Sequence, residues 1–192
     1  MLTAIALALA AAPAAQAATD DGILSRMTAL YDEVCLKDFP KDEAVASAMM
    51  AKGATPLKPD EVQIYLHDDP GRGWAIDDGA EKFVVTIEAP PYHACSVRRR
   101  TPSGFPDLAT YYAVAGPYEA AAGGGYNKMK PMDMKVGDIT SHASGEQKVA
   151  PNGSAEALYV FSNTPSEPEN RAKGYTAVEV RFVHQFVSPG AH

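Results

Sequence analysis

Residues 83–100, FVVTIEAPPYHACSVRRR, decide the fold of this 192-residue chain. Phe83 to Ile87 are rich in β-branched side chains that alternate in polarity, which predicts a strand. Pro90-Pro91 end that strand, and Tyr92 to Arg100 resume the two-residue period, which predicts a neighbouring strand. The two faces of this second strand differ: one carries His93, Cys95 and Val97, and the other carries Tyr92, Ala94, Ser96 and Arg98.

Outside this stretch, helical spacing and turn residues predict further elements on both sides. Helices are expected over Ile23–Leu36, from Phe39-Pro40 to Gly53, and from Phe105 to a kink or end at Gly116-Pro117. Strands are expected over Val62–Leu66, Gly73–Asp77, Met132–Thr140, Ala155–Ser162 and Tyr175–Val187, with a hairpin turn at Asn152-Gly153. The prediction is an α+β fold, a mostly antiparallel sheet packed by about three helices. The dipeptide Phe-Pro occurs at Phe39-Pro40 and again at Phe105-Pro106, which is consistent with a duplicated unit of helix plus strands.

The first seventeen residues have the pattern of an export signal. An apolar run from Leu2 to Ala12 precedes Pro13 and the small-residue site Ala15-Gln16-Ala17. The run is too short to span a bilayer, although it departs from the usual pattern in having no Lys or Arg before it. We therefore expect a signal peptide over 1–17, a single domain over 18–192, and a periplasmic or secreted protein.

The chain contains two cysteines, Cys35 and Cys95. An exported protein meets an oxidising environment, so the simplest expectation is one disulfide between them. It would tether the first helix to the sheet and, by chain entropy, contribute about 4 kcal/mol of stability.

The formal net charge is −7. Binding to a nucleic-acid backbone needs a basic surface, so nucleic acid is not an expected partner. No later stretch is long and apolar enough to predict a membrane span.

The clearest cationic feature is the triplet Arg98-Arg99-Arg100. On a strand, Arg98 and Arg100 share a face and Arg99 opposes them, so the pair could cradle a carboxylate or phosphate. With Tyr92 and Trp74 they form the candidate ligand-binding set. The competing interpretation is that these arginines pair with the acidic residues of the first third of the chain.

Histidines and carboxylates supply the alternative, catalytic candidates. His67, Asp69 and His93 could act as general acid or base, although a simple turn explains Asp68-Asp69-Pro70-Gly71 equally well. Cys35, His93, Cys95 and His184 could ligate zinc, but Cys95 in a disulfide beside an ordinary structural histidine is favoured, so no metal or cofactor is expected. His184, on an apolar strand face, is expected to be a satisfied core histidine.

Three stretches, residues 66–74 (LHDDPGRGW), 89–98 (APPYHACSVR) and 178–185 (VEVRFVHQ), resemble a family of uncharacterised bacterial envelope proteins that carry signal peptides. The resemblance implies that the protein is located in the cell envelope, and it assigns no catalytic residue. The expected function is a non-catalytic module that binds a small anionic ligand or an envelope protein. The alternative is a small envelope hydrolase using His/Asp acid–base chemistry, with or without a metal.

Overall fold

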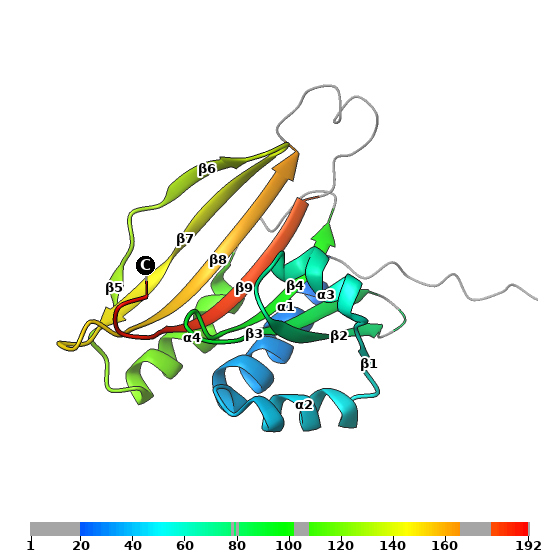
Figure 1. Ribbon diagram of the computed structural model, residues 1–192, viewed down its shortest axis with the longest axis horizontal. Helices are drawn as coiled ribbons and strands as arrows, with labels where there is room; N and C mark the ends of the chain where they lie inside the picture. The colour runs from blue at the N-terminus through cyan, green and yellow to red at the C-terminus, as the bar shows by residue number, and fades with distance from the viewer. Residues whose placement is uncertain (1–19, 78, 80, 102–107, 166–177, 192) are drawn as a thin grey trace, which may run out of the picture.

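The computed structural model describes residues 20–77, 79, 81–101, 108–165 and 178–191 (Figure 1). The expected signal peptide and Phe105-Pro106 lie outside these residues. The fold is α+β, with one antiparallel sheet of nine strands and helices packed against it. This confirms the predicted fold class.

The chain order alternates helices with groups of strands. The elements are α1 (Asp20–Tyr31), the π-helical segment η1 (Asp32–Asp38), α2 (Asp42–Ala51), β1 (Thr55–Pro56), α3 (Pro59–Leu66), β2 (Gly71–Asp77), β3 (Lys82–Glu88), β4 (Ala94–Thr101), α4 (Ala109–Ala121), β5 (Asn127–Lys128), β6 (Met132–Val136), β7 (Ile139–Val149), β8 (Ala155–Pro165) and β9 (Val178–Val187).

The sheet joins two groups of strands through a pairing between distant segments. Strands β2, β3 and β4 are neighbours in sequence and in space, and so are β7, β8 and β9. The last described strand, β9, pairs with β4 rather than lying at an edge, and this contact closes the order β1-β2-β3-β4-β9-β8-β7-β5, with β6 also on β7.

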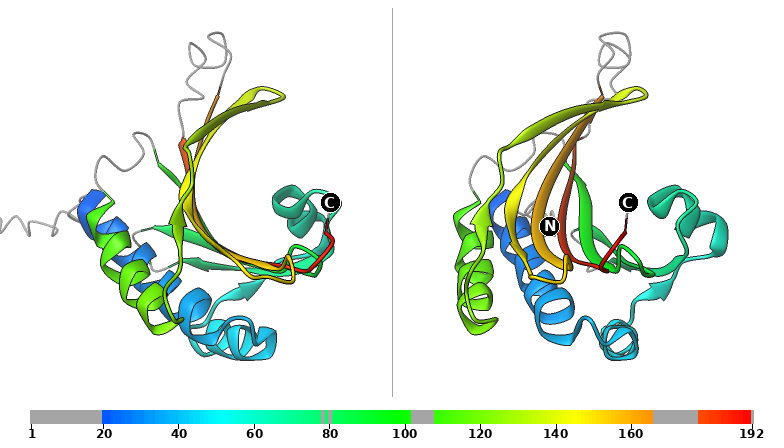
Figure 2. Two further views of the ribbon diagram at one scale, coloured as in Figure 1. Left: turned by 90° about the vertical axis from the view of Figure 1, so that its left-hand side faces the viewer. Right: turned by 60° about the vertical axis from the view of Figure 1, so that its left-hand side comes forward.

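The sheet is strongly curved, and its two faces are covered differently (Figure 2). Helices α1, α2 and α4 lie against the convex face, whereas α3 stands at the opening of the concave face. The convex face carries the hydrophobic core, in which Tyr31 and Met49 pack with strand residues such as Val85, Val97 and Phe182. The two-residue period of the strands separates this apolar face from a polar concave face.

The disulfide Cys35–Cys95 joins η1 to β4, with its Cα atoms 5.4 Å apart. Both cysteines are fully buried within the core cluster. The predicted bridge is therefore confirmed, and it ties the helical layer to the centre of the sheet.

The predicted strand Val62–Leu66 is wrong, because these residues belong to helix α3. The alternating polarity of so short a segment misled the prediction, whereas Pro59 in the first turn and Asp60 and Glu61 beside it are helix-start signals. The correction matters for function, because α3 covers the concave face.

One predicted strand is also wrong in its bounds. The strand expected over Met132–Thr140 is a hairpin, in which Gly137 with a φ of 58° lies between β6 and β7. The sequence predicted that helix α4 would kink or end at Gly116-Pro117, and the helix does not end there but continues through Pro117 to Ala121. The turn at Asn152-Gly153 is confirmed and connects β7 to β8. Within the described residues, no helix is long and apolar enough to cross a membrane.

Candidate functional site: paired arginines in a concave cleft

Arg98 and Arg181 are directly opposite each other on the neighbouring strands β4 and β9. Residues in register on adjacent antiparallel strands point to the same face, so the two side chains lie together on the concave side. Like charges in this position repel each other, and their pairing is destabilising unless something compensates it. Strand alternation predicted the face of β4 on which Arg98 lies, but it did not show that Arg181 lies opposite Arg98.

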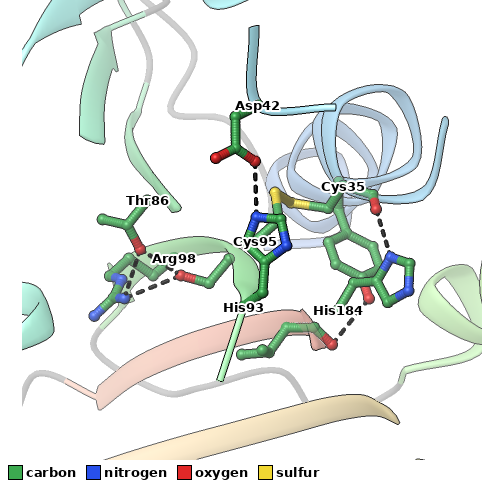
Figure 3. Close-up of a disulfide and its surroundings, with 10 residues drawn as sticks. Cys35, Asp42, Thr86, His93, Cys95, Arg98 and His184 are labelled. Carbon is green, nitrogen blue, oxygen red and sulfur yellow. Dashed lines mark hydrogen bonds and ion pairs between the residues drawn. A yellow bond between two sulfur atoms is a disulfide. The ribbon is translucent and has the colours of Figure 1, made fainter. Parts of the chain in front are cut away.

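Arg98 is held deep in the cleft, with only 4% of its surface exposed. One terminal nitrogen donates to the hydroxyls of Thr86 at 3.1 Å and Ser96 at 3.0 Å (Figure 3). The guanidinium also lies 5.0 Å from the centre of the Tyr65 ring on α3. Burial, followed by the positive charge of Arg181, lowers the pKa of Arg98 to about 10. The protein therefore holds this cation in an unfavourable environment.

Arg181 is less firmly held than Arg98. Its guanidinium stacks over the Phe161 ring, with 4.4 Å between the guanidinium carbon and the ring centre. Burial also lowers the pKa of Arg181. The Nε atoms of both arginines are buried and have no hydrogen-bond partner among the described residues. Two donors in one cleft are thus left for an acceptor that the protein does not supply.

Carboxylates balance these cations only in part. Arg98 lies 3.8 Å from Glu179, and Glu88 lines the same region of the concave face. Burial, followed by the nearby Asp69, raises the pKa of Glu88. With Arg100, the cleft holds three guanidinium groups and two carboxylates. One net positive charge remains.

Two adjoining cavities open beside the paired arginines. The inner cavity has a volume of ≈70 Å³ and is lined mainly by polar side chains, including Thr86, Ser96 and Gln185. The outer cavity has a volume of ≈460 Å³ and lies under α3. Arg98, Phe161 and Arg181 line both, so they separate the inner recess from the outer cleft.

Helix α3 covers the outer cavity and ends at a strained residue. His67 follows its last turn with φ 56° and ψ −121°, a region that favours glycine. Such backbone strain is frequent at ligand sites. His67 lines the outer cavity together with Arg98 and Arg100.

The structure brings together only some of the predicted site residues. Arg98, Arg100 and His67 share the outer cavity, whereas Trp74 is buried in the core on the other face. Tyr92 precedes β4 and does not line either cavity. The competing idea of pairing with early acidic residues holds for Arg99, which lies 3.7 Å from Glu81 on the opposite face.

His93 lies apart from the cleft. Its Nε2 is 2.8 Å from Asp42 at the start of α2 (Figure 3). Its ring packs against Phe39. It borders a different cavity of ≈390 Å³, which Phe186 and Glu156 also line. Asp69 lies in a further cavity between α3 and β2, which His67 also lines. The zinc interpretation loses its thiolate ligands, because Cys35 and Cys95 are bonded to each other.

A buried polar cluster surrounds His184 on the convex face. Its Nδ1 donates to the carbonyl of Cys35 at 2.7 Å (Figure 3). Its Nε2 lies 2.9 Å from Glu156. The Tyr118 hydroxyl donates to the same carboxylate oxygen at 2.6 Å. The prediction that His184 is a satisfied core histidine is confirmed. Its partners come from η1, α4 and β8, which sequence spacing could not bring together.

The other residues that the sequence did not identify are Arg181, Phe161 and Glu179. Glu179 and Arg181 alternate with Val178, Val180 and Phe182 along β9, but nothing in the sequence shows that β9 pairs with β4. Comparison with protein-family models, with curated proteins and with solved structures gives no match at all.

Proposed function

We propose that the chain is an exported envelope protein that binds a small anionic ligand in the concave cleft. One observation supports this above all: the buried Arg98 faces the half-buried Arg181, and the Nε atom of each is buried with no acceptor within the described part of the chain. An anion would neutralise the repulsion between them and accept both hydrogen bonds.

Export rests on separate support. The first seventeen residues have the pattern of a signal peptide. A buried disulfide fits an oxidising compartment such as the periplasm or the exterior. The resemblance to signal-bearing bacterial envelope proteins points the same way.

A binding role has better support than the alternative, a small hydrolase that uses His67, Asp69 and His93. A general base must lie within hydrogen-bond reach of the group it serves. His67 and Asp69 line one cavity but His93 lines a different one, so the three residues do not form one acid–base site. The arginine cleft supplies two cationic donors instead, which suit recognition.

The proposal is tested by titrating the folded protein with sodium butyrate and following backbone amide chemical shifts. We expect saturable shifts confined to β4, β9 and α3, and at least tenfold weaker binding in Arg181→Met. Methionine keeps an apolar stem on Phe161 and removes a buried charge, so this variant should be at least as stable as the wild type.

The matched control is Arg72→Met, because Arg72 is an exposed arginine that pairs with Glu43 at 2.9 Å outside this cleft. It should bind butyrate like the wild type. Scattered shifts that never saturate, or equal binding by Arg181→Met and the wild type, would overturn the proposal.

A further inference from the structure

Exposed aliphatic side chains form part of the lining of the outer cavity. Ile64 on α3 is 67% exposed and Ile139 on β7 is 44% exposed, and both line it. Met134 on β6 joins them. Large aliphatic side chains that are exposed singly over a surface are normal and do not indicate a binding site. These three come from three different elements and meet at one opening.

Phe161 continues this apolar surface inward. Its ring lies under the guanidinium of Arg181 and borders both the outer and the inner cavity. A ligand that follows the surface from Ile64 and Ile139 past Phe161 therefore reaches Arg98 and Arg181, which line both cavities. Exposed aliphatic side chains lie at the rim of the cleft, and the buried Arg98 lies at its floor.

Size and charge restrict the group that can occupy the floor. The inner cavity, ≈70 Å³, admits only a small polar group. The single net positive charge left by three arginines and two glutamates matches one negative charge and not a polyanion. A carboxylate also matches the planar guanidinium group in shape.

From these observations we infer that the ligand is an amphiphile with one carboxylate, whose head reaches Arg98 and Arg181 and whose aliphatic chain lies along Phe161 toward Ile64, Met134 and Ile139. The inference rests on the proposed function and specifies its ligand class. Affinity should then increase with chain length, because each buried methylene adds to binding.

The test compares sodium decanoate, sodium butyrate and decan-1-ol in calorimetric titrations of the wild-type protein, with decanoate kept below the concentration at which it forms micelles. We expect decanoate to bind at least tenfold more tightly than either of the others. Butyrate lacks the chain, and the alcohol lacks the charge.

Two exposed rim positions provide variants that should not disturb folding. Ile64→Ser and Ile139→Ser should each weaken decanoate binding severalfold and leave butyrate binding unchanged. The control is Val149→Ser, because Val149 lies on the same strand as Ile139, is 60% exposed and does not line the cleft. It should change neither affinity.

The two proposals fail in different ways. If butyrate and decanoate bind equally well and the rim variants bind decanoate like the wild type, the cleft takes small anions and the amphiphile inference is wrong. If decan-1-ol binds as tightly as decanoate, the charge has no role and the inference is also wrong. If no anion binds and Arg181→Met changes nothing, the proposed function itself fails.

Discussion

At the residue scale, Glu156 is the carboxylate whose ionisation contributes most clearly to stability. Burial raises its pKa, but hydrogen bonds from His184 and Tyr118 outweigh burial and bring the pKa to about 2 from the usual 4.5. Its folded pKa is therefore below its unfolded pKa. The resulting stabilisation is fully present above about pH 4.5 and is lost as the pH falls toward about 2.

We expect Glu156→Gln to reduce the free energy of unfolding at pH 7 by about 1–3 kcal/mol, because the ion-assisted hydrogen bonds are lost. Below pH 3 the difference in unfolding free energy between the variant and the wild type should fall toward zero. Urea unfolding at a series of pH values measures both effects.

The control for this variant is Glu43→Gln, which alters an exposed carboxylate paired with Arg72. An exposed ion pair contributes little, so the change should stay within about 0.5 kcal/mol at every pH. If the difference in unfolding free energy between Glu156→Gln and the wild type stays constant down to pH 2, the ionisation of Glu156 is not the source of the stabilisation.

Residue-level predictions from sequence succeeded where strand alternation alone decides the outcome. Cys95 points to the core and Arg98 to the other face, as their spacing indicated. Alternation could not show that Arg181 stands opposite Arg98, because that depends on the pairing of strands separated by most of the chain. The candidate site was therefore only half visible in the sequence.

At the element scale, the long β7–β8 hairpin allows one very close approach between strands. A Cβ on Gly145 would overlap the backbone oxygen of Leu158 and lie 3.0 Å from the Cα of Tyr159. Backbone atoms in a ladder cannot move aside independently. The glycine is therefore required by its neighbours and not by its own torsion angles.

We expect Gly145→Ala to destabilise the protein by about 2 kcal/mol or more, because the strain spreads through the hairpin. Gly116→Ala is the matched control. It lies within helix α4, where an added Cβ meets no atom within 4 Å. This variant should be about 0.5–1 kcal/mol more stable than the wild type, since alanine is the better helix former. The measurement is the urea concentration at the midpoint of unfolding for each variant. Equal midpoints for Gly145→Ala and Gly116→Ala would refute the packing argument.

Element predictions failed where a segment was short and its cues conflicted. In α3, five residues of alternating polarity outweighed the helix-start signals at Pro59 and Asp60. In β6–β7, a single Gly137 turn lay inside what resembled one strand. The long apolar patterns of α1, β3 and β9 were identified correctly, because many residues agree there.

At the scale of the whole molecule, the disulfide is the covalent link between the helical layer and the sheet. It spans 60 residues, and closing such a loop removes conformational freedom mainly from the unfolded chain. We expect the double variant Cys35→Ala, Cys95→Ala to lose about 4 kcal/mol of unfolding free energy.

Urea unfolding with and without dithiothreitol provides the comparison for this variant. The reduced wild type should unfold at the midpoint of the double variant, since both lack the bridge. Because the sulfurs are buried, reduction should proceed only once the protein unfolds. A reduced wild type that keeps the midpoint of the oxidised protein would contradict the expected contribution.

The position of β9 has a consequence for the order in which the sheet assembles during translation. This strand is synthesised after every other described strand, yet it lies between β4 and β8 in the middle of the sheet. Until β9 has been made, β4 and β8 lack the strand that joins them, and the part of the concave face that carries Arg181 is missing. The curved sheet can therefore close only late in translation, when β9 pairs with both of its neighbours.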